Sequence, residues 1–253
     1  MANNSGVVLY SAFQPSGVQY GPVDRNRNGG KFVPLLGTDG AKKRFTIQTP
    51  PLSMPFGISA YREKPDAEVQ SYSLDVSFRN TDSDPRVAEF LQKMQDLDAH
   101  MLHASVENSK AWFGKVKSKD TLEDNYRRLV KAHPQGKYPP VMKIKIPIQN
   151  GQVACMFFDE SKKPTDLDYL TKGTTIKLIL EMDRVWFVNN TFGVTWRALQ
   201  GAVVSRPSRM DTYSMIDEDV DDATLLGLDS GAGGLGGDGG LRTDDMEMPA
   251  ELA

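Results

Sequence analysis

The sequence predicts an α+β fold that is mainly β, with two helices inserted between antiparallel strands. Residues 70–79 and 141–146 alternate apolar and polar side chains, which is typical of half-buried strands. Between them, residues 85–104 carry apolar side chains at three- and four-residue spacing, which is typical of an amphipathic helix. Beyond residue 209 this periodicity ends and an acidic, glycine-rich stretch follows. We therefore expect one folded domain with a C-terminal tail.

Charge is distributed unevenly along the 253 residues. Residues 211–253 contain 12 Asp and Glu against the single Arg242, a net charge of −11. Residues 1–210 carry 29 Lys and Arg against 21 Asp and Glu, a net charge of +8. Such asymmetry is typical of proteins with nucleic-acid partners or interaction tails. We expect residues 209–253 to form a disordered tail, because their glycine-rich run at 231–240 is typical of a flexible linker.

Residues 1–43 are polar, rich in Gly and Asn, and interrupted by three prolines. Basic side chains gather in and just after this segment, against only Asp24 and Asp39: Arg25, Arg27, Lys31, Lys42, Lys43 and Arg44. We interpret residues 1–43 as a flexible basic arm. The alternative is an arm that becomes ordered on binding phosphate.

Residues 44–208 are predicted to form the folded domain. Its first segment, residues 45–58, is strand-like, but its prolines restrict it to a sheet edge or an irregular lead-in. The next strand places four apolar side chains on one face: Tyr72, Leu74, Val76 and Phe78. Asp84 and Pro85 then have the residue types of a helix cap and first helical position.

A second, short helix is predicted over residues 121–131. Asp120 and Glu123 have the spacing of a helix start. The helix would bury Leu122, Tyr126, Leu129 and Val130. Its opposite flank would be cationic.

Residues 138–204 are predicted to form a compact antiparallel unit rich in β-branched and aromatic residues. In strand 141–146 the apolar residues face the core, so Lys143 and Lys145 point the other way. Asn150-Gly151 predicts a hairpin turn into the next strand. Further strands are expected at residues 152–158, 173–182, 185–188 and 192–200.

The sequence contains no phosphate loop, dinucleotide fingerprint, zinc-protease helix or hydrolase elbow. Cys155 is the only cysteine, which excludes an intrachain disulfide and a cysteine-built metal site. We expect no metal, no cofactor and no enzymatic activity. A nuclease-like carboxylate site using Asp75, Asp159 or Asp183 is an alternative, and a chelator would abolish its activity.

The N-terminus lacks the features of a signal peptide, and nowhere do 18 apolar residues run together. We therefore expect a soluble, intracellular protein that does not enter a membrane.

Aromatic and basic residues are interleaved along the predicted strands. A β-surface with both kinds of side chain can stack bases and neutralise phosphates of single-stranded nucleic acid. Lys143 and Lys145 are the clearest candidates, whereas burial in the core is the alternative role for each aromatic residue. The candidate nucleic-acid-binding residues are Lys110, Trp112, Lys115, Lys117, Arg127, Arg128, Lys143, Lys145, Lys177, Arg184, Trp186, Trp196 and Arg197.

Five short motifs are spread between residues 44 and 205. They are Pro50-Pro51-Leu52-x-Met54-Pro55-Phe56-Gly57, Trp112-Phe113-Gly114-Lys115, Tyr138-Pro139-Pro140-x-Met142-Lys143-x-Lys145, Val185-Trp186-Phe187 and Phe192-Gly193-Val194-Thr195-Trp196. Together they resemble a family of single-stranded-DNA-binding proteins of nucleocytoplasmic large DNA viruses and giant viruses, similar in plan to phage replication proteins. The resemblance implies an OB-like antiparallel barrel with inserted helices, and an acidic tail that contacts replication proteins. Tails of the phage proteins end in an aromatic residue, whereas this chain ends in Leu252-Ala253.

We therefore expect a protein that binds single-stranded DNA with little sequence specificity. The resemblance implies that it coats exposed strands during viral DNA replication, recombination or repair, at a replication site in the host cytoplasm or nucleus. The tail would regulate the binding of DNA and of partners. The alternative is a β-rich scaffold for protein partners, in a virion or in transcription, that binds no nucleic acid. The sequence leaves open whether the chain forms a homo-oligomer and whether DNA or RNA is preferred.

Overall fold

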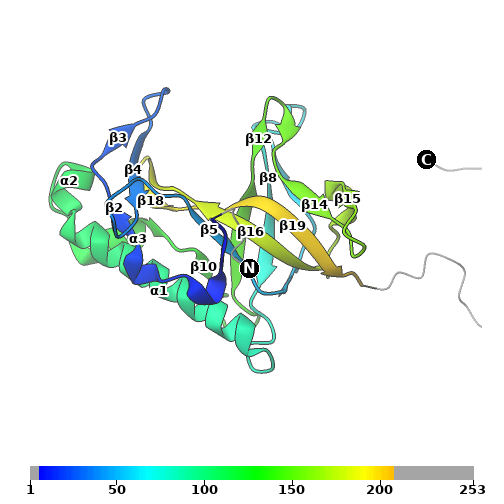
Figure 1. Ribbon diagram of the computed structural model, residues 1–253. Coiled ribbons are helices and arrows are strands. Elements are labelled where there is room, and N and C mark those ends of the chain that lie inside the picture. Colours follow the sequence, from blue (N-terminus) through cyan, green and yellow to red (C-terminus); the bar gives the residue numbers. More distant parts are fainter. Residues whose placement is uncertain (1–5, 208–253) are drawn as a thin grey trace, which may run out of the picture. The chain divides into compact units, whose positions relative to one another are not determined.

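The computed structural model describes residues 6–207, and their strands form two main sheets (Figure 1). The strands of the first sheet close into a ring, because β16 pairs with both β19 and β6. Around the ring, in order, lie β6 (Leu52–Ser53), β8 (Ser71–Ser77), β11 (Val141–Ile146), β19 (Arg197–Ser205) and β16 (Thr175–Met182). All neighbours are antiparallel except β11 and β19. A five-stranded Greek-key barrel of this kind is the OB fold, so the predicted OB-like barrel is confirmed.

Strand β11 shows how the sequence sets the inside and outside of the barrel. Met142, Ile144 and Ile146 are fully buried, whereas Lys143 and Lys145 are exposed on the other face. On β8, Leu74 and Val76 are buried in the same core. The predicted alternation of both strands is therefore confirmed.

Short strands extend the barrel sheet at its edges. They are β1 (Val8–Leu9), β5 (Phe45–Gln48), β7 (Ser59–Tyr61), β10 (Val130–Lys131), β14 (Met156–Phe158) and β15 (Pro164–Thr165). A separate hairpin joins β12 (Ile148–Gln149) to β13 (Gln152–Val153). Its turn is the predicted Asn150-Gly151, and both residues have positive φ.

The second sheet is formed by segments from three distant parts of the chain. Its strands are β2 (Gln19–Tyr20), β3 (Asp24–Arg25), β4 (Lys31–Leu36), β17 (Arg184–Val188), β18 (Thr191–Val194) and β9 (Tyr126–Arg127). Strand β16 of the barrel leads into β17 through Asp183 alone. The connection between β16 and β19 therefore belongs to the second sheet.

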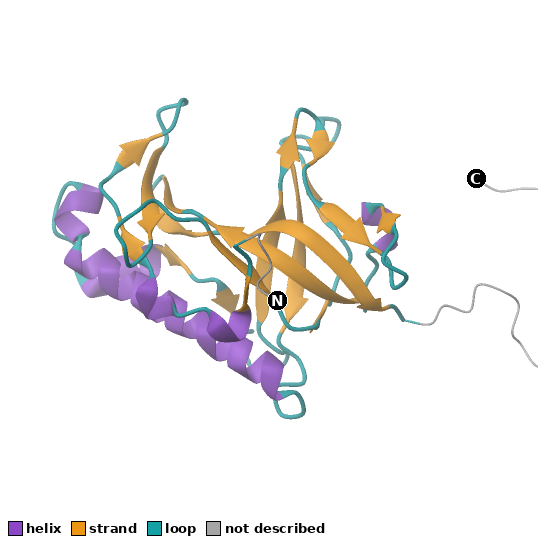
Figure 2. Ribbon diagram, in the orientation of Figure 1, coloured by secondary structure: helices purple, strands orange, loops and turns teal. Residues whose placement is uncertain are grey.

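Helix α1 (Pro85–Glu107) lies along one side of both sheets (Figure 2). Its cap is the predicted Asp84, whose side chain accepts a hydrogen bond from the Arg86 backbone N–H. The predicted apolar stripe is buried, including Phe90, Met94 and Leu97. The remaining helices are short: α2 (Ser109–Phe113), α3 (Lys119–Asn125), and the 3-10 turns η1 (Tyr10–Ala12), η2 (Pro15–Gly17) and η3 (Leu167–Tyr169).

The helix predicted over residues 121–131 is correct only as far as Asn125. Helix α3 is capped by Ser118 and ends at Asn125. The chain then becomes extended as β9 and β10, because β9 pairs with β18 and β10 pairs with β11. These tertiary strand pairings override the helical pattern of the sequence.

The prediction of a flexible arm over residues 1–43 is wrong for the described residues 6–43, which are folded. Residues 6–207 belong to one compact unit, and Val33 and Leu35 of β4 are fully buried. The earlier part of the segment is held against α1. There Lys93 donates to the Phe13 carbonyl oxygen at 2.8 Å, and His100 Nε2 lies 2.8 Å from the Val18 carbonyl oxygen.

The predicted tail over residues 209–253 lies outside the described residues. Among residues 6–207, no helix is both long enough and apolar enough to cross a membrane.

Candidate nucleic-acid interface

A groove of about 570 Å³ lies over the outward face of β8 and β11. Its floor includes Ser71 and Ser73 of β8 with Lys143 and Lys145 of β11. Its other walls come from β7, from residues 127–131 and from β17 with the end of β18. In OB folds, the face of the second and third barrel strands and the adjoining loops are the usual place for nucleic-acid ligands. We call this hollow the basic groove.

Five cationic side chains and two solvent-facing aromatic ones line the basic groove: Arg127, Arg128, Lys131, Lys143, Lys145, Tyr61 and Trp186. No carboxylate belongs to its lining. Lys143 pairs with Asp75 at 3.1 Å, and Arg128 pairs with Glu123. The other three cations have no carboxylate within 4.0 Å in the described part of the chain. The groove is therefore strongly cationic.

Trp186 is fixed in a half-buried position at the boundary of the basic groove. Its indole N–H donates to the Thr195 hydroxyl at 2.9 Å. Its ring lies against Gly193, where an added Cβ would stand 3.0 Å from both the ring and the Arg127 carbonyl oxygen. Glycine at this position thus lets β9 and the indole approach β18 together. Tyr61, on β7, is 60% exposed.

Asp98 of α1 holds the segment that carries three of the groove cations. Its carboxylate accepts hydrogen bonds from the Tyr126 hydroxyl (2.6 Å) and from the backbone N–H groups of Leu129 (2.9 Å) and Val130 (3.2 Å). Burial raises the pKa of Asp98, although these hydrogen bonds oppose the rise. Asp98 thereby fixes the extended backbone that presents Arg127, Arg128 and Lys131 to the groove.

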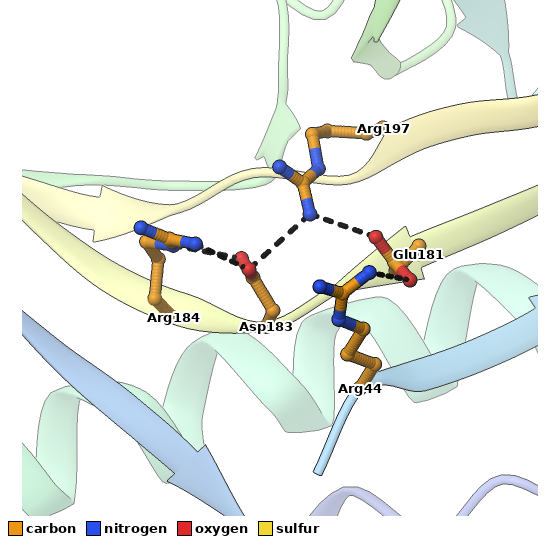
Figure 3. A network of polar contacts seen from close by, with 5 residues as sticks. All are labelled: Arg44, Glu181, Asp183, Arg184 and Arg197. Atoms are coloured by element: carbon orange, nitrogen blue, oxygen red, sulfur yellow. Dashed lines mark hydrogen bonds and ion pairs between the residues drawn. The ribbon is translucent and has the colours of Figure 1, made fainter. Parts of the chain in front are cut away.

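A second hollow adjoins the basic groove and shares Lys145, Trp186 and Thr195 with it. Here the arginines are paired with carboxylates (Figure 3). Arg197 contacts Glu181 at 2.7 Å and Asp183 at 3.2 Å, and Arg184 contacts Asp183 at 2.7 Å. Arg44 also pairs with Glu181, at 3.5 Å.

Three arginines and two carboxylates leave this network with one net positive charge at neutral pH. Burial opposes ionisation of Asp183, but the hydrogen bond from Arg184 and the charges of Arg197 and Arg44 outweigh it, so the pKa of Asp183 is lowered. Since both carboxylates are occupied in pairing, Arg184 and Arg197 are less available to phosphate than the unpaired cations of the basic groove.

Residues 75–217 match the model of a family described as "Family of unknown function (DUF5871)". The match spans more than half of the chain. The chain belongs to this family. No curated protein matches the sequence.

Solved structures of two phage proteins are similar to this DUF5871 chain at low identity. The single-stranded DNA-binding protein from bacteriophage Enc34 is 10% identical, with a TM-score of 0.41 over 82% of this chain and 99% of that one. The same phage protein in complex with ssDNA is 9% identical, with a TM-score of 0.41 over 76% and 98%. The protein gp2.5 of bacteriophage T7, also titled a single-stranded DNA binding protein, is 15% identical, with a TM-score of 0.42 over 70% and 99%. The family description mentions no giant virus, so that part of the resemblance stays a prediction.

The structure brings together seven of the candidate residues of this DUF5871 member. Five line the basic groove: Arg127, Arg128, Lys143, Lys145 and Trp186. Two line the adjoining hollow: Arg184 and Arg197. Four exposed or half-exposed lysines line neither: Lys110, Lys115, Lys117 and Lys177.

Two of the candidate aromatics prove to be core residues. Trp112 is 2% exposed and packs edge-on against Tyr20, while Trp196 is fully buried against Phe13. Neither indole can stack on a base in this conformation. Their alternative role in the core is therefore the correct one.

Tyr61 and Lys131 line the basic groove but were not among the binding residues predicted from the sequence. Strand β7 has only three residues, too few to show a periodicity. Lys131 was assigned to a helix that ends six residues earlier. The signal for Lys131 was its place beside Arg127 and Arg128 in one basic cluster.

Proposed function

We propose that this protein binds single-stranded DNA in the basic groove with little sequence specificity. The observation that carries the proposal is the convergence of five cations with the aromatic side chains of Tyr61 and Trp186 in one groove whose lining lacks a carboxylate. Cations neutralise phosphates whatever the sequence, and aromatic rings stack on any base. Stacking needs unpaired bases, which favours single strands over duplex.

The proposed role is to coat exposed strands during viral DNA replication, recombination or repair, with the acidic tail regulating access to the groove and contacting replication proteins. Its support is the resemblance of the five motifs and the charge of −11 on residues 211–253 against +8 on the rest. Opposite charges of this size attract, so the tail can compete with DNA for the groove.

We propose no enzymatic activity. The three carboxylates of the nuclease alternative serve separate contacts. Asp75 pairs with Lys143, Asp159 accepts backbone N–H groups of its own loop, and Asp183 pairs with arginines. Within residues 6–207, no three His, Cys, Asp or Glu side chains are grouped so that they could hold a metal ion.

Fluorescence anisotropy with labelled oligo-dT, a duplex of equal length and the matching RNA, each at two salt concentrations, tests the proposal. We expect oligo-dT to bind more tightly than the duplex, and to bind more weakly as salt rises because phosphate contacts release counterions. The triple variant Arg127→Ala, Lys131→Ala, Lys145→Ala should lose most of this binding. Lys177→Ala is the matched control, since it removes an exposed strand lysine outside the groove. Equal affinity for the duplex would contradict the preference for single strands, and salt-independent binding would favour the protein scaffold instead.

A further inference from the structure

Another hollow, of about 530 Å³, lies at the opposite end of the strands that floor the basic groove. Two cations line it, Arg79 just after β8 and Lys172 just before β16. Neither has a carboxylate partner within 4.0 Å among the residues the structure describes. Pro55 and Pro139 supply apolar walls. We call this site the distal hollow.

The distal hollow is in line with the basic groove on one face of β8 and β11. Side chains of a strand alternate between its two faces, so residues of equal parity share a face. On β8, Ser71 and Ser73 line the basic groove, and Ser77 lines the distal hollow. The chain segments stay paired beyond the end of β8 and the start of β11, because the Phe78 N–H donates to the Pro140 carbonyl oxygen at 2.9 Å.

The ion pair between Lys143 and Asp75 stands between the two hollows. These residues are opposite each other in the register of β8 and β11, on the same outward face. Lys143 is therefore positioned to contact a phosphate that passes from one hollow to the other. Asp75 neutralises this lysine in the free protein.

Two exposed aromatic residues, each 57% exposed, are chain neighbours of residues that line the distal hollow: Phe56 follows Pro55, and Tyr138, whose ring packs edge-on against His133, precedes Pro139. A bulge explains the exposure of Phe56. From Ser53 in β6 to Ser59 in β7 the chain takes six residue steps, while their common partner β8 takes four from Ser77 to Ser73. The two extra residues leave the segment 55–58 unpaired with β8, as in a β-bulge, whereas Met54 stays buried.

We infer that the distal hollow is a second binding site for the same DNA strand, so that single-stranded DNA runs along β8 and β11 from the basic groove, past Lys143, to Arg79 and Lys172. This inference rests on the proposed function. From Lys145 to Pro139 the path covers six residues of extended chain, or about 20 Å. Because successive nucleotides of one strand lie at least about 3.4 Å apart, a strand of about three nucleotides would fill the basic groove alone, and roughly six or more would reach both sites, within the range known for OB folds.

The double variant Arg79→Ala, Lys172→Ala tests this assignment with two oligonucleotides, dT of about 3 and of about 20 nucleotides. We expect the variant to bind the long oligonucleotide roughly tenfold more weakly, with a salt slope smaller by about two, and to bind the short one like the wild type. Lys162→Ala with Lys163→Ala is the matched control, because it removes two exposed lysines of the loop between β14 and β15.

Unchanged binding of the long oligonucleotide would overturn the inference, and so would an equal loss for both lengths. If the wild type binds neither oligonucleotide, the proposed function itself fails. Ultraviolet cross-linking of the long oligonucleotide gives an independent readout. Cross-linked peptides containing Phe56 or Tyr138 support the path, whereas cross-links confined to Tyr61 and Trp186 contradict it.

Discussion

At the scale of single residues, position in the fold gives the three tryptophans different roles. Trp112 and Trp196 are buried, whereas Trp186 lies half-buried at the edge of the basic groove. Its hydrogen bond to Thr195 and its contact with Gly193 fix the ring before any ligand arrives. A ring that is already ordered loses little conformational entropy on stacking.

Trp186→Ala should weaken binding of oligo-dT about tenfold, since stacking of one base contributes roughly 1–3 kcal/mol. Trp186→Phe is the matched variant, because it keeps an aromatic ring while losing the hydrogen bond to Thr195 and the indole contact with Gly193. We expect it to retain most of the affinity in anisotropy titrations. If the alanine variant binds like the wild type, Trp186 does not stack on a base.

Lys143→Ala with Lys145→Ala should weaken binding of all sequences alike and leave the fold intact. Both side chains are exposed on the outward face of β11, so little packing is lost. Anisotropy with oligonucleotides of several sequences measures the affinity, and circular dichroism measures whether the fold is intact. An unfolded double variant would contradict the assignment of this face.

Asp75→Asn should act in the opposite direction, because it releases Lys143 from its carboxylate partner. We expect tighter binding of oligo-dT at low salt, and a difference from the wild type that shrinks as salt rises. Weaker binding would mean that Asp75 holds Lys143 in its productive position. Titrations at two salt concentrations distinguish these outcomes.

At the scale of elements, helix α1 organises the wall of the basic groove through one buried carboxylate. Asp98 holds the two short strands β9 and β10 and the bend at Leu129 between them, after α3 has ended. The pairings β9 with β18 and β10 with β11 complete the support. The cationic wall is therefore built by contacts between distant segments.

Asp98→Ala should lower both stability and DNA affinity. It leaves three buried donors without their acceptor, and each such group costs about 1–3 kcal/mol. At about 2–4 °C per kcal/mol for a domain of this size, we expect the Tm to fall by at least roughly 6 °C. Hydrogen exchange should become faster at Leu129 and Val130. Asp96→Ala, at an exposed position of the same helix, is the control and should change neither property.

At the scale of the whole molecule, the distribution of charge is the dominant feature. The body carries +8 and residues 211–253 carry −11. Three of the body's cations without a carboxylate partner among the described residues, Arg127, Lys131 and Lys145, line the basic groove together. This charge distribution predicts that a polyanion approaching the groove competes with the chain's own acidic segment.

Truncation after Arg209 should tighten binding of oligo-dT and flatten its dependence on salt, because a tethered competitor of −11 is removed. High salt should erase the difference between the two proteins, since it screens tail and DNA alike. Titrations of both proteins across a salt series measure this. Weaker binding by the truncated form would make the tail part of the DNA site.

Local patterns in the sequence determined the strands 70–79 and 141–146, the long helix with its Asp84 cap, the Asn150-Gly151 turn and the outward direction of Lys143 and Lys145. Each of these follows from residues that are neighbours along the chain. Only the tertiary structure decided which aromatic residues are buried, that residues 126–131 are extended, and that β4 belongs to the core. The physical reason is that strand pairing and burial depend on distant partners. Trp186 lies in β17 and Trp196, ten residues later, lies between β18 and β19. Phe13 packs against Trp196, whereas the groove borders Trp186.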